Sequence, residues 1–428
     1  MPGGTGRRLV LLNRDLRLHD HPALRAAGAG GVVAFVLDEE LLALPTLGAN
    51  RLAYLLEALE ALRRACRGLG GDLVVRRGRL GEEVLALAGA AGASELHATR
   101  DVSAFARRRQ QVLGELCSRA GCTLVLHDGV GIVPPGSLAP AGGDHYKVFT
   151  PYWRAWQEVP RRPLLRAPRS LAPLPDGLEP GRIPSLAELA GGGRQADPLG
   201  RRNVPPLVLE GPSPLRQPGG ERAARRRLAA FAEGSAAYEA DKDDLSREGT
   251  SRLSADLHFG CLSALEVEAR LAERSPEYIR QLCWRDFFLS VTHAVPDVAR
   301  RDYRERARHW RRDDAELEAW RGGETGVPLV DAAMHQLEAE GYVHGRARLV
   351  AASYLTKTLR HHWREGADHF LRALTDGDVA SNSCNWQWMA GTGNDTRPNR
   401  VLNPERQARR FDPSGRYRAR YGGGAGAP

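Results

Sequence analysis

Residues 376–388 read DGDVASNSCNWQW and combine carboxylates, amides and indoles in one short segment. Asp378 and Asn382 are four residues apart, so they can meet on one face of a helix. Trp386 and Trp388 follow, in a chain that has only eight tryptophans. Amide and carboxylate groups can hydrogen-bond a polar heterocycle while indole rings lie beside it. The segment therefore predicts a binding site for a redox-active or light-absorbing cofactor.

Two other segments carry residue types that suit such a site. Residues 250–254 (TSRLS) place three hydroxyls before a helical pattern. Hydroxyls and free N–H groups at a helix start can hold phosphate, although a helix cap is their commoner role. Gln281, Trp284 and Arg285 fall at helical spacing in an apolar run, where a lone indole is more often part of the core. Neither segment is specific without support from the rest of the chain.

The bulk composition limits the class of protein. The chain has 428 residues, enough for two domains, and a net charge of +9, which favours a polyanionic partner such as nucleic acid. Arginine-rich composition alone is weak support for that partner. No apolar run reaches the roughly 18 residues of a membrane span, and the N-terminus lacks a signal-peptide pattern. The six cysteines show no CxxC or zinc spacing, so we expect reduced thiols, no metal and a cytoplasmic protein.

The first third of the chain alternates strand and helix patterns. This alternation predicts an α/β domain over residues 1–130, built as a doubly wound parallel sheet with helices on both faces. No GxGxxG motif follows the first strand, so a nicotinamide-type fingerprint is absent. The expected strands are 9–12, 32–37, 73–75, 95–98 and 123–126, and the expected helices lie near 50–68, 81–91 and 103–120.

The composition changes after residue 130. Prolines and glycines crowd residues 131–220, which predicts a long interdomain connector with little regular structure apart from an ordered stretch at 146–152. From 221 to 428, apolar residues recur at three- and four-residue spacing, so we expect an all-α domain. We expect the glycine-rich end from residue 418 onward to be disordered.

Short motifs follow one another in a fixed order over nearly the whole chain. They are NRDLRLHDHPAL, YKVFTPYWRAW, TSRLS, WRDFF, TGVPLVDAAM, VHGRARL, HHWREG, DGDVASN, NWQW and RVLNP. Their order and spacing resemble the DNA photolyase/cryptochrome family, and class I cyclobutane pyrimidine dimer photolyases in particular. The resemblance implies a deoxyribodipyrimidine photo-lyase, which uses blue light and reduced FAD to repair UV-damaged DNA by electron transfer. The alternative is a cryptochrome-like photoreceptor with little or no repair activity.

The resemblance places a U-shaped FAD in the helical domain. Arg348 and Asp376 would pair beside the isoalloxazine ring, and Asn382 would face flavin N5. Electrons would pass from the surface to the flavin through three tryptophans, Trp310, Trp363 and Trp386. The cofactor-binding residues that the family implies are Tyr238, Thr250, Ser251, Arg252, Leu253, Ser254, Arg285, Arg348, Asp376, Gly377, Asp378 and Asn382.

The resemblance also implies a surface that faces the lesion. Trp284 and Trp388 would grip the flipped dimer by stacking, as in base-flipping enzymes. A flavoprotein without a DNA role would not need this tryptophan pair. The implied DNA-binding residues are Lys242, Gln281, Trp284, Arg285, Gly345, Arg346, Trp388 and Gln407, with Arg397 and Arg400 around the cavity. Gln281, Trp284 and Trp388 also count among the catalytic residues.

Several of these positions depart from the family pattern. Gln281 stands where the family has a glutamate and cannot supply a proton, and Gly345 replaces an asparagine. Lys242 replaces an arginine, and Leu349 replaces a methionine. A lost hydrogen bond to substrate costs about 1–3 kcal/mol, which would slow repair without abolishing it. A (6-4) photolyase is disfavoured, because that group has two adjacent histidines where this chain has His344 followed by glycine.

An antenna pigment would bind in the first domain. The folate-type residue pair falls on Phe105 and Ala106, so folate is not expected. Asp38, Arg51 and Asp101 fall where deazaflavin-binding members carry polar contacts, which leaves 8-hydroxy-5-deazaflavin and no antenna as open alternatives. Each of the three residues also has an ordinary structural role, because Asp38 and Asp101 end strands and Arg51 begins a helix. We expect the protein to be a monomer.

Overall fold

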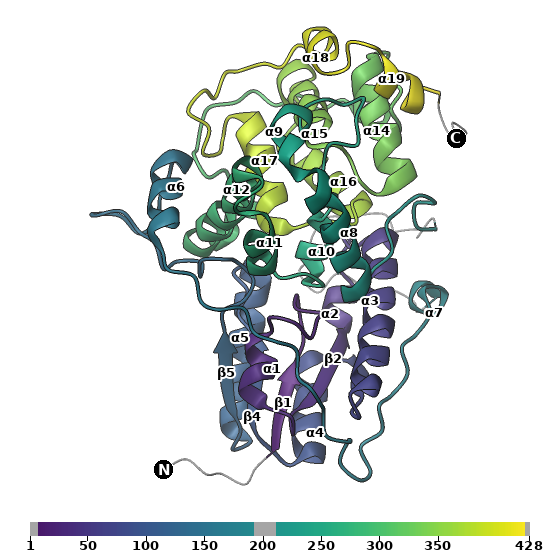
Figure 1. Ribbon diagram of the computed structural model, residues 1–428. Helices are drawn as coiled ribbons and strands as arrows, with labels where there is room; N and C mark the ends of the chain where they lie inside the picture. Colours follow the sequence, from purple (N-terminus) through teal and green to yellow (C-terminus); the bar gives the residue numbers. More distant parts are fainter. Residues whose placement is uncertain (1–6, 192–210, 424–428) are drawn as a thin grey trace.

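The computed structural model describes residues 7–191 and 211–423, which form an α/β domain and a helical domain joined by a long connector (Figure 1). The α/β domain holds a five-stranded parallel sheet in the order β3-β2-β1-β4-β5. The strands are β1 (Arg7–Leu11), β2 (Val32–Asp38), β3 (Leu73–Gly78), β4 (Ala93–Thr99) and β5 (Thr123–His127).

Helices cover both faces of this sheet. They are α1 (Pro22–Ala27), α2 (Glu39–Leu42), α3 (Ala49–Gly68), α4 (Leu80–Ala91) and α5 (Ala104–Arg119). Val10 of β1 joins a core with α1 and α3, whereas Leu9 and Leu11 join the core with α4 and α5. Every residue of β2 is buried, because the strand is covered on both sides. The predicted doubly wound parallel sheet is therefore confirmed.

The connector holds two short helices, α6 (Phe149–Glu158) and α7 (Leu186–Gly191). It is fixed to the helical domain by Asp286 of α12 (Pro276–Ala294), which is 1% exposed. One oxygen of Asp286 accepts hydrogen bonds from the backbone N–H groups of Ile132 and Val133 and from Trp156 Nε1, each at 2.9 Å. A single buried carboxylate thus holds the start of the connector and α6 against the helix that carries Trp284.

The helical domain is confirmed as all-α over the part that the structure describes. Its helices are α8 (Glu221–Gly234), η1 (Ser235–Ala237), α9 (Tyr238–Asp241), α10 (Ser254–Phe259), α11 (Ala264–Leu271), α12, η2 (Pro296–Ala299), α13 (Asp314–Gly322), α14 (Pro328–Glu340), α15 (Gly345–Ser353), the π-helix η3 (Tyr354–Thr358), α16 (Trp363–Ala373), α17 (Val379–Ala390), α18 (Pro404–Phe411) and α19 (Arg416–Tyr421). Within residues 7–191 and 211–423, none of the helices has the length and apolar character needed to cross a bilayer.

The expected disorder from residue 418 onward is wrong for the first part of that stretch. Residues 418–421 end α19, which packs on α14. Tyr417 and Tyr421 are buried there, and Tyr417 Oη donates to Gln336 Oε1 at 2.8 Å. Burial of two aromatic rings outweighs the weak helix pattern of so short a segment. Residues 424–428 lie outside the described part of the chain.

Candidate functional site

A cavity of about 590 Å³ lies in the helical domain among α9, α10, α12, α15 and α17. Every residue that the sequence assigned to FAD binding lines this cavity: Tyr238, Thr250, Ser251, Arg252, Leu253, Ser254, Arg285, Arg348, Asp376, Gly377, Asp378 and Asn382. These residues come from segments up to more than a hundred positions apart, so the fold brings together groups that no local pattern could connect.

The TSRLS segment contributes hydroxyls to the cavity wall rather than a free positive charge. Arg252 has a φ of 52°, which bends the chain into α10. Its guanidinium donates to the Glu340 carboxylate at 2.5 Å and lies over the Tyr342 ring. Ser251 Oγ lies 2.7 Å from Tyr278 Oη, and Thr250 Oγ1 lies 3.2 Å from Tyr342 Oη. Hydroxyls and backbone N–H groups remain as the groups of this segment that could hold a phosphate.

Arg348 and Asp376 form the expected pair. Arg348 Nη2 donates to Asp376 Oδ2 at 2.8 Å, and Arg348 Nε donates to the Val343 carbonyl at 2.7 Å. Asp376 is 8% exposed, and its second oxygen, Oδ1, is buried without a hydrogen-bond partner in the described chain. An unpaired buried acceptor is costly, so it suits a donor from a bound molecule, such as a ring N–H of a flavin.

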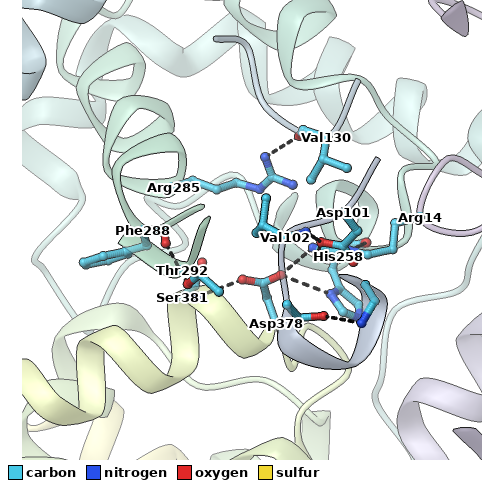
Figure 2. A network of polar contacts seen from close by, with 12 residues as sticks. Arg14, Asp101, Val102, Val130, His258, Arg285, Phe288, Thr292, Asp378 and Ser381 are labelled. Atoms are coloured by element: carbon cyan, nitrogen blue, oxygen red, sulfur yellow. Dashed lines mark hydrogen bonds and ion pairs between the residues drawn. The ribbon is translucent and has the colours of Figure 1, made fainter. Parts of the chain in front are cut away.

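Asp378 is the centre of a polar network that Figure 2 shows from close by. Its Oδ1 accepts the backbone N–H of Ser381 at 2.8 Å and caps α17, while its Oδ2 accepts a hydrogen bond from Arg14 and lies 3.7 Å from His258 Nδ1. Burial by itself raises the pKa of Asp378, but Arg14 and His258 hold that pKa well below its usual value. Asp378 is therefore an ionised carboxylate in the cavity wall, paired with the Arg14 cation.

Asn382 lies one turn further along α17. Its Nδ2 donates to the Ala367 carbonyl at 3.0 Å, which leaves Oδ1 able to accept a hydrogen bond from a ligand in the cavity. The cavity thus offers hydroxyls at one end and an amide oxygen, an unpaired carboxylate oxygen and an arginine at the other. This set of donors and acceptors fits a dinucleotide with a polar ring system.

Of the three tryptophans assigned to electron transfer, Trp386 and Trp363 are buried and Trp310 is partly exposed. Trp386 lines the cavity and packs against Gly366 of α16, where an added Cβ would lie 2.1 Å from the indole ring. Trp363 begins α16, is 1% exposed, and donates from Nε1 to Asp302 Oδ1 at 2.7 Å. Trp310 is half-buried, and the His362 ring lies 5.1 Å from Trp310 and 5.7 Å from Trp363.

The aromatic pair assigned to the lesion lies beside this cavity. Trp284 and Trp388 meet edge to face at 5.3 Å, and Trp284 stacks on Phe149 of α6 at 3.7 Å. Gln281 is exposed at the cavity lining, one helical turn from Trp284, with its Nε2 at 3.4 Å from Glu277 Oε1. Gly345 is also exposed there, with open space where a Cβ would stand.

The predicted DNA-contacting cations differ in how free they are. Lys242 pairs with Glu277, and Arg346 pairs with Asp243 at 2.7 Å. Arg285 is turned inward and donates to the Val130 carbonyl at 2.6 Å (Figure 2). It also lies 3.3 Å from the Leu257 carbonyl, and these contacts favour its cofactor role over a DNA contact.

Three further polar residues assigned to DNA lie near the C-terminal end of the chain. Arg397 and Arg400 are exposed between α17 and α18 and have no ion pair to a described residue. Gln407 of α18 has a buried Oε1 without a partner in the described chain. Among the cations assigned to DNA, these two arginines are therefore the ones without an ion pair within the described chain.

A second cavity of about 310 Å³ lies where the α/β domain meets the helical domain. Arg51 and Asp101 line it, as do Phe105 and Ala106. Asp38 is set back from the lining: it caps α2 and lies 3.2 Å from Arg109, which does line the cavity.

Residues outside the predicted site complete both cavities. His258 and Gly377 line the two cavities together, so the cavities share a wall. Arg14 lines the second cavity and reaches Asp378 of the first. Only Arg14 had a signal in the sequence, because it lies in the NRDLRLHDHPAL motif directly after a strand. Neither His258 nor Tyr342, which lines the first cavity, was indicated by any signal in the sequence.

Comparison with known proteins matches this architecture. Residues 8–173 match the family model described as DNA photolyase, and residues 278–422 match the model of the FAD binding domain of DNA photolyase. The chain is 46% identical to the deoxyribodipyrimidine photo-lyase of Streptomyces griseus, over 96% of this chain and 88% of that protein.

Two solved structures are similar over almost the whole chain. A class III photolyase from Agrobacterium tumefaciens superposes with a TM-score of 0.85 at 28% identity, covering 98% of this chain and 87% of that one. A cryptochrome from Synechocystis gives a TM-score of 0.85 at 26% identity, covering 98% and 89% of the two chains. The overall fold therefore does not separate a repair enzyme from a light sensor.

Proposed function

Since this chain belongs to the DNA photolyase family and contains that family's FAD-binding domain, we propose that it is a blue-light-driven deoxyribodipyrimidine photo-lyase. Its substrate in this proposal is the cyclobutane pyrimidine dimer in UV-damaged DNA, as in class I enzymes. The observation that carries the proposal is the convergence of all the predicted cofactor residues on one cavity, with Gln281 and Gly345 exposed at its lining and the Trp284–Trp388 pair beside it.

The residues of the cavity would have different roles in binding FAD and supporting repair. Arg348 and Asp376 would hold and orient the ring system, the hydroxyls of Thr250 and Ser251 would hold the phosphates, and Asn382 would accept a hydrogen bond near the reactive edge. When bound and reduced, FAD supplies the electron that light transfers to the dimer. The apolar surroundings of Trp386 exclude water from this side of the site.

The second cavity is our proposed antenna site. Arg51 and Asp101 would supply polar contacts to an 8-hydroxy-5-deazaflavin, and Asp38 would act through Arg109. Phe105 and Ala106 line this cavity without a polar side-chain group, which supports the expectation that folate is not the pigment.

The enzyme is tested by irradiating the reduced protein with blue light in the presence of an oligonucleotide that contains one thymine dimer. Absorbance near the thymine band should recover in the light and stay constant in the dark. A protein that binds FAD and photoreduces it, but never restores this absorbance, would be a cryptochrome-like photoreceptor instead.

The altered lesion-facing residues should limit the rate of repair. We expect Gln281→Glu and Gly345→Asn each to raise dimer splitting by about fivefold, the effect of one regained hydrogen bond of about 1 kcal/mol. Single-turnover repair yields measure the effect.

A glycine elsewhere provides the control for this pair. Gly89 of α4 likewise has open space around its Cβ position, so Gly89→Asn should leave the repair yield unchanged. Equal yields for wild type and for both lesion-side variants would show that our account of Gln281 and Gly345 is wrong.

DNA binding should depend on Arg397 and Arg400. Each phosphate contact contributes about 0.9 to the slope of log K against log salt, so the double variant Arg397→Gln/Arg400→Gln should flatten that slope by about 2. Fluorescence anisotropy of a dimer-containing duplex at a series of salt concentrations gives the slope. The exposed Arg25 and Arg77 of the α/β domain serve as controls, since their replacement by glutamine should not change it. An unaltered slope in the Arg397/Arg400 variant would place the phosphates elsewhere.

A further inference from the structure

Arg14 belongs to the α/β domain but bonds to the wall of the flavin cavity in the helical domain. It follows β1, and all three nitrogens of its guanidinium contact acceptor groups (Figure 2). Nη2 donates to Asp378 Oδ2, Nη1 lies 3.3 Å from Asp101 Oδ1, and Nε donates to the His258 carbonyl at 3.1 Å. The side chain is 19% exposed, so solvent weakens these interactions little.

Within residues 7–191 and 211–423, Asp378 has no other close cation that could balance its charge equally well. His258 lies 3.7 Å away, and burial lowers its pKa, which favours the neutral imidazole. Arg285 faces carbonyl groups, and Arg51 donates to the carbonyls of Thr46 and Gly377. The direct ion pair of Asp378 is therefore the one with Arg14.

This balance matters because Asp378 lines the cavity assigned to FAD. Two-electron reduction of a flavin with uptake of one proton from the medium leaves one additional negative charge on the flavin. A bare carboxylate in the wall would repel that charge, and a low local dielectric would make the repulsion strong. An arginine that fixes and neutralises the carboxylate removes this penalty.

We infer that Arg14 is a positioning residue for the flavin, supplied by the other domain, which fixes Asp378 and cancels its charge so that the bound cofactor is easier to reduce. The inference rests on the FAD site proposed above. The plain alternative is that Arg14 only joins the two domains. A joining role would change the thermal stability, whereas charge balance changes the reduction potential.

The test is a spectroelectrochemical titration of the FAD-loaded full chain at pH 8, where Asp378 stays ionised without Arg14 because of its cap on α17 and the charge of Arg285. In Arg14→Met, the ratio of reduced to oxidised flavin at a fixed electrode potential should fall on the order of tenfold, as expected for one uncompensated charge in a partly buried site. Adding Asp378→Asn to this variant should restore the wild-type ratio, because the carboxylate that lines the cavity is then neutral, and Asp101, the other partner of Arg14, does not line that cavity. Arg14→Lys should stay near wild type.

Arg161 provides a matched control. It also joins parts of the chain through a half-buried ion pair, to Glu268 at 3.0 Å, but it lines neither cavity. Arg161→Met should lower the melting temperature and leave the flavin ratio unchanged.

The inference is overturned if Arg14→Met loses stability but keeps the wild-type ratio, or if Asp378→Asn does not restore it. Loss of FAD from both Arg14→Met and Arg14→Lys would also overturn it, since geometry rather than charge would then be decisive. Because the readout is a potential, it is independent of dimer splitting. A wild-type protein that fails to repair DNA would refute the proposed function, but the ratio of reduced to oxidised flavin could still be measured and interpreted.

Discussion

Replacing Trp386 with phenylalanine is expected to abolish nearly all photoreduction of the flavin while the chemically reduced protein keeps its repair activity. Trp386 is the only one of the three assigned tryptophans that lines the proposed flavin cavity in the described chain, so in the proposed series electrons from Trp363 and Trp310 would pass through it. A phenyl ring is far harder to oxidise than an indole. Photoreduction is followed by the loss of oxidised-flavin absorbance under blue light with an external thiol as electron source.

Trp320 offers a close control for this substitution. It is fully buried and its ring centroid lies 5.9 Å from that of Trp386, yet it has no place in the assigned series. Trp320→Phe and Trp386→Phe each remove part of a buried indole and should each destabilise the fold by about 1–3 kcal/mol. Only Trp386→Phe should stop photoreduction. Equal photoreduction in both variants would mean that electrons reach the flavin by another route.

Replacing Arg348 with methionine is expected to weaken FAD binding by roughly 10- to 100-fold. The change removes a cation from the cavity wall and leaves Asp376 without its partner, and the loss of one charged hydrogen-bonding contact costs about 1.5–3 kcal/mol. Titration of the flavin-free protein with FAD, followed by flavin fluorescence, measures the loss. Adding Asp376→Asn should recover part of the affinity, because it removes the stranded charge.

Arg321 is the control for the Arg348 prediction. It does not line the cavity and pairs with two exposed carboxylates, Glu318 and Glu365, where an ion pair contributes about 0–1 kcal/mol, so Arg321→Met should bind FAD as the wild type does. Wild-type FAD affinity in Arg348→Met would show that the Arg348–Asp376 pair does not hold the cofactor.

The fold could be predicted from the sequence because its main signals are local. The buried run Val32–Asp38 has the continuous apolar character that a doubly covered strand needs, and the helical domain shows its spacing over long stretches. The end of the chain was misjudged, because α19 is held by burial of Tyr417 and Tyr421 against a distant helix. A long-range stabilising contact of that kind cannot be recognised from the composition of the segment itself.

The site was predicted in part for the same reason. The assigned flavin residues all line one cavity, but which of the arginines are free to bind a phosphate could not be read from the sequence. Arg252 and Arg346 are both paired with carboxylates that lie 88 and 103 positions away. The role inferred for Arg14 likewise depends on a contact between residues 364 positions apart. Such contacts follow from the packing of the two domains and have no local signature.

The central claim is that light-driven dimer splitting by this protein is catalytic, and a turnover count tests it most directly. Reduced protein is mixed with an excess of thymine-dimer oligonucleotide under continuous blue light, and repaired strands are counted by chromatography. Our account predicts many repaired strands per protein molecule in the light and none in the dark. A protein with bound, photoreducible FAD that repairs no strand under these conditions would contradict it.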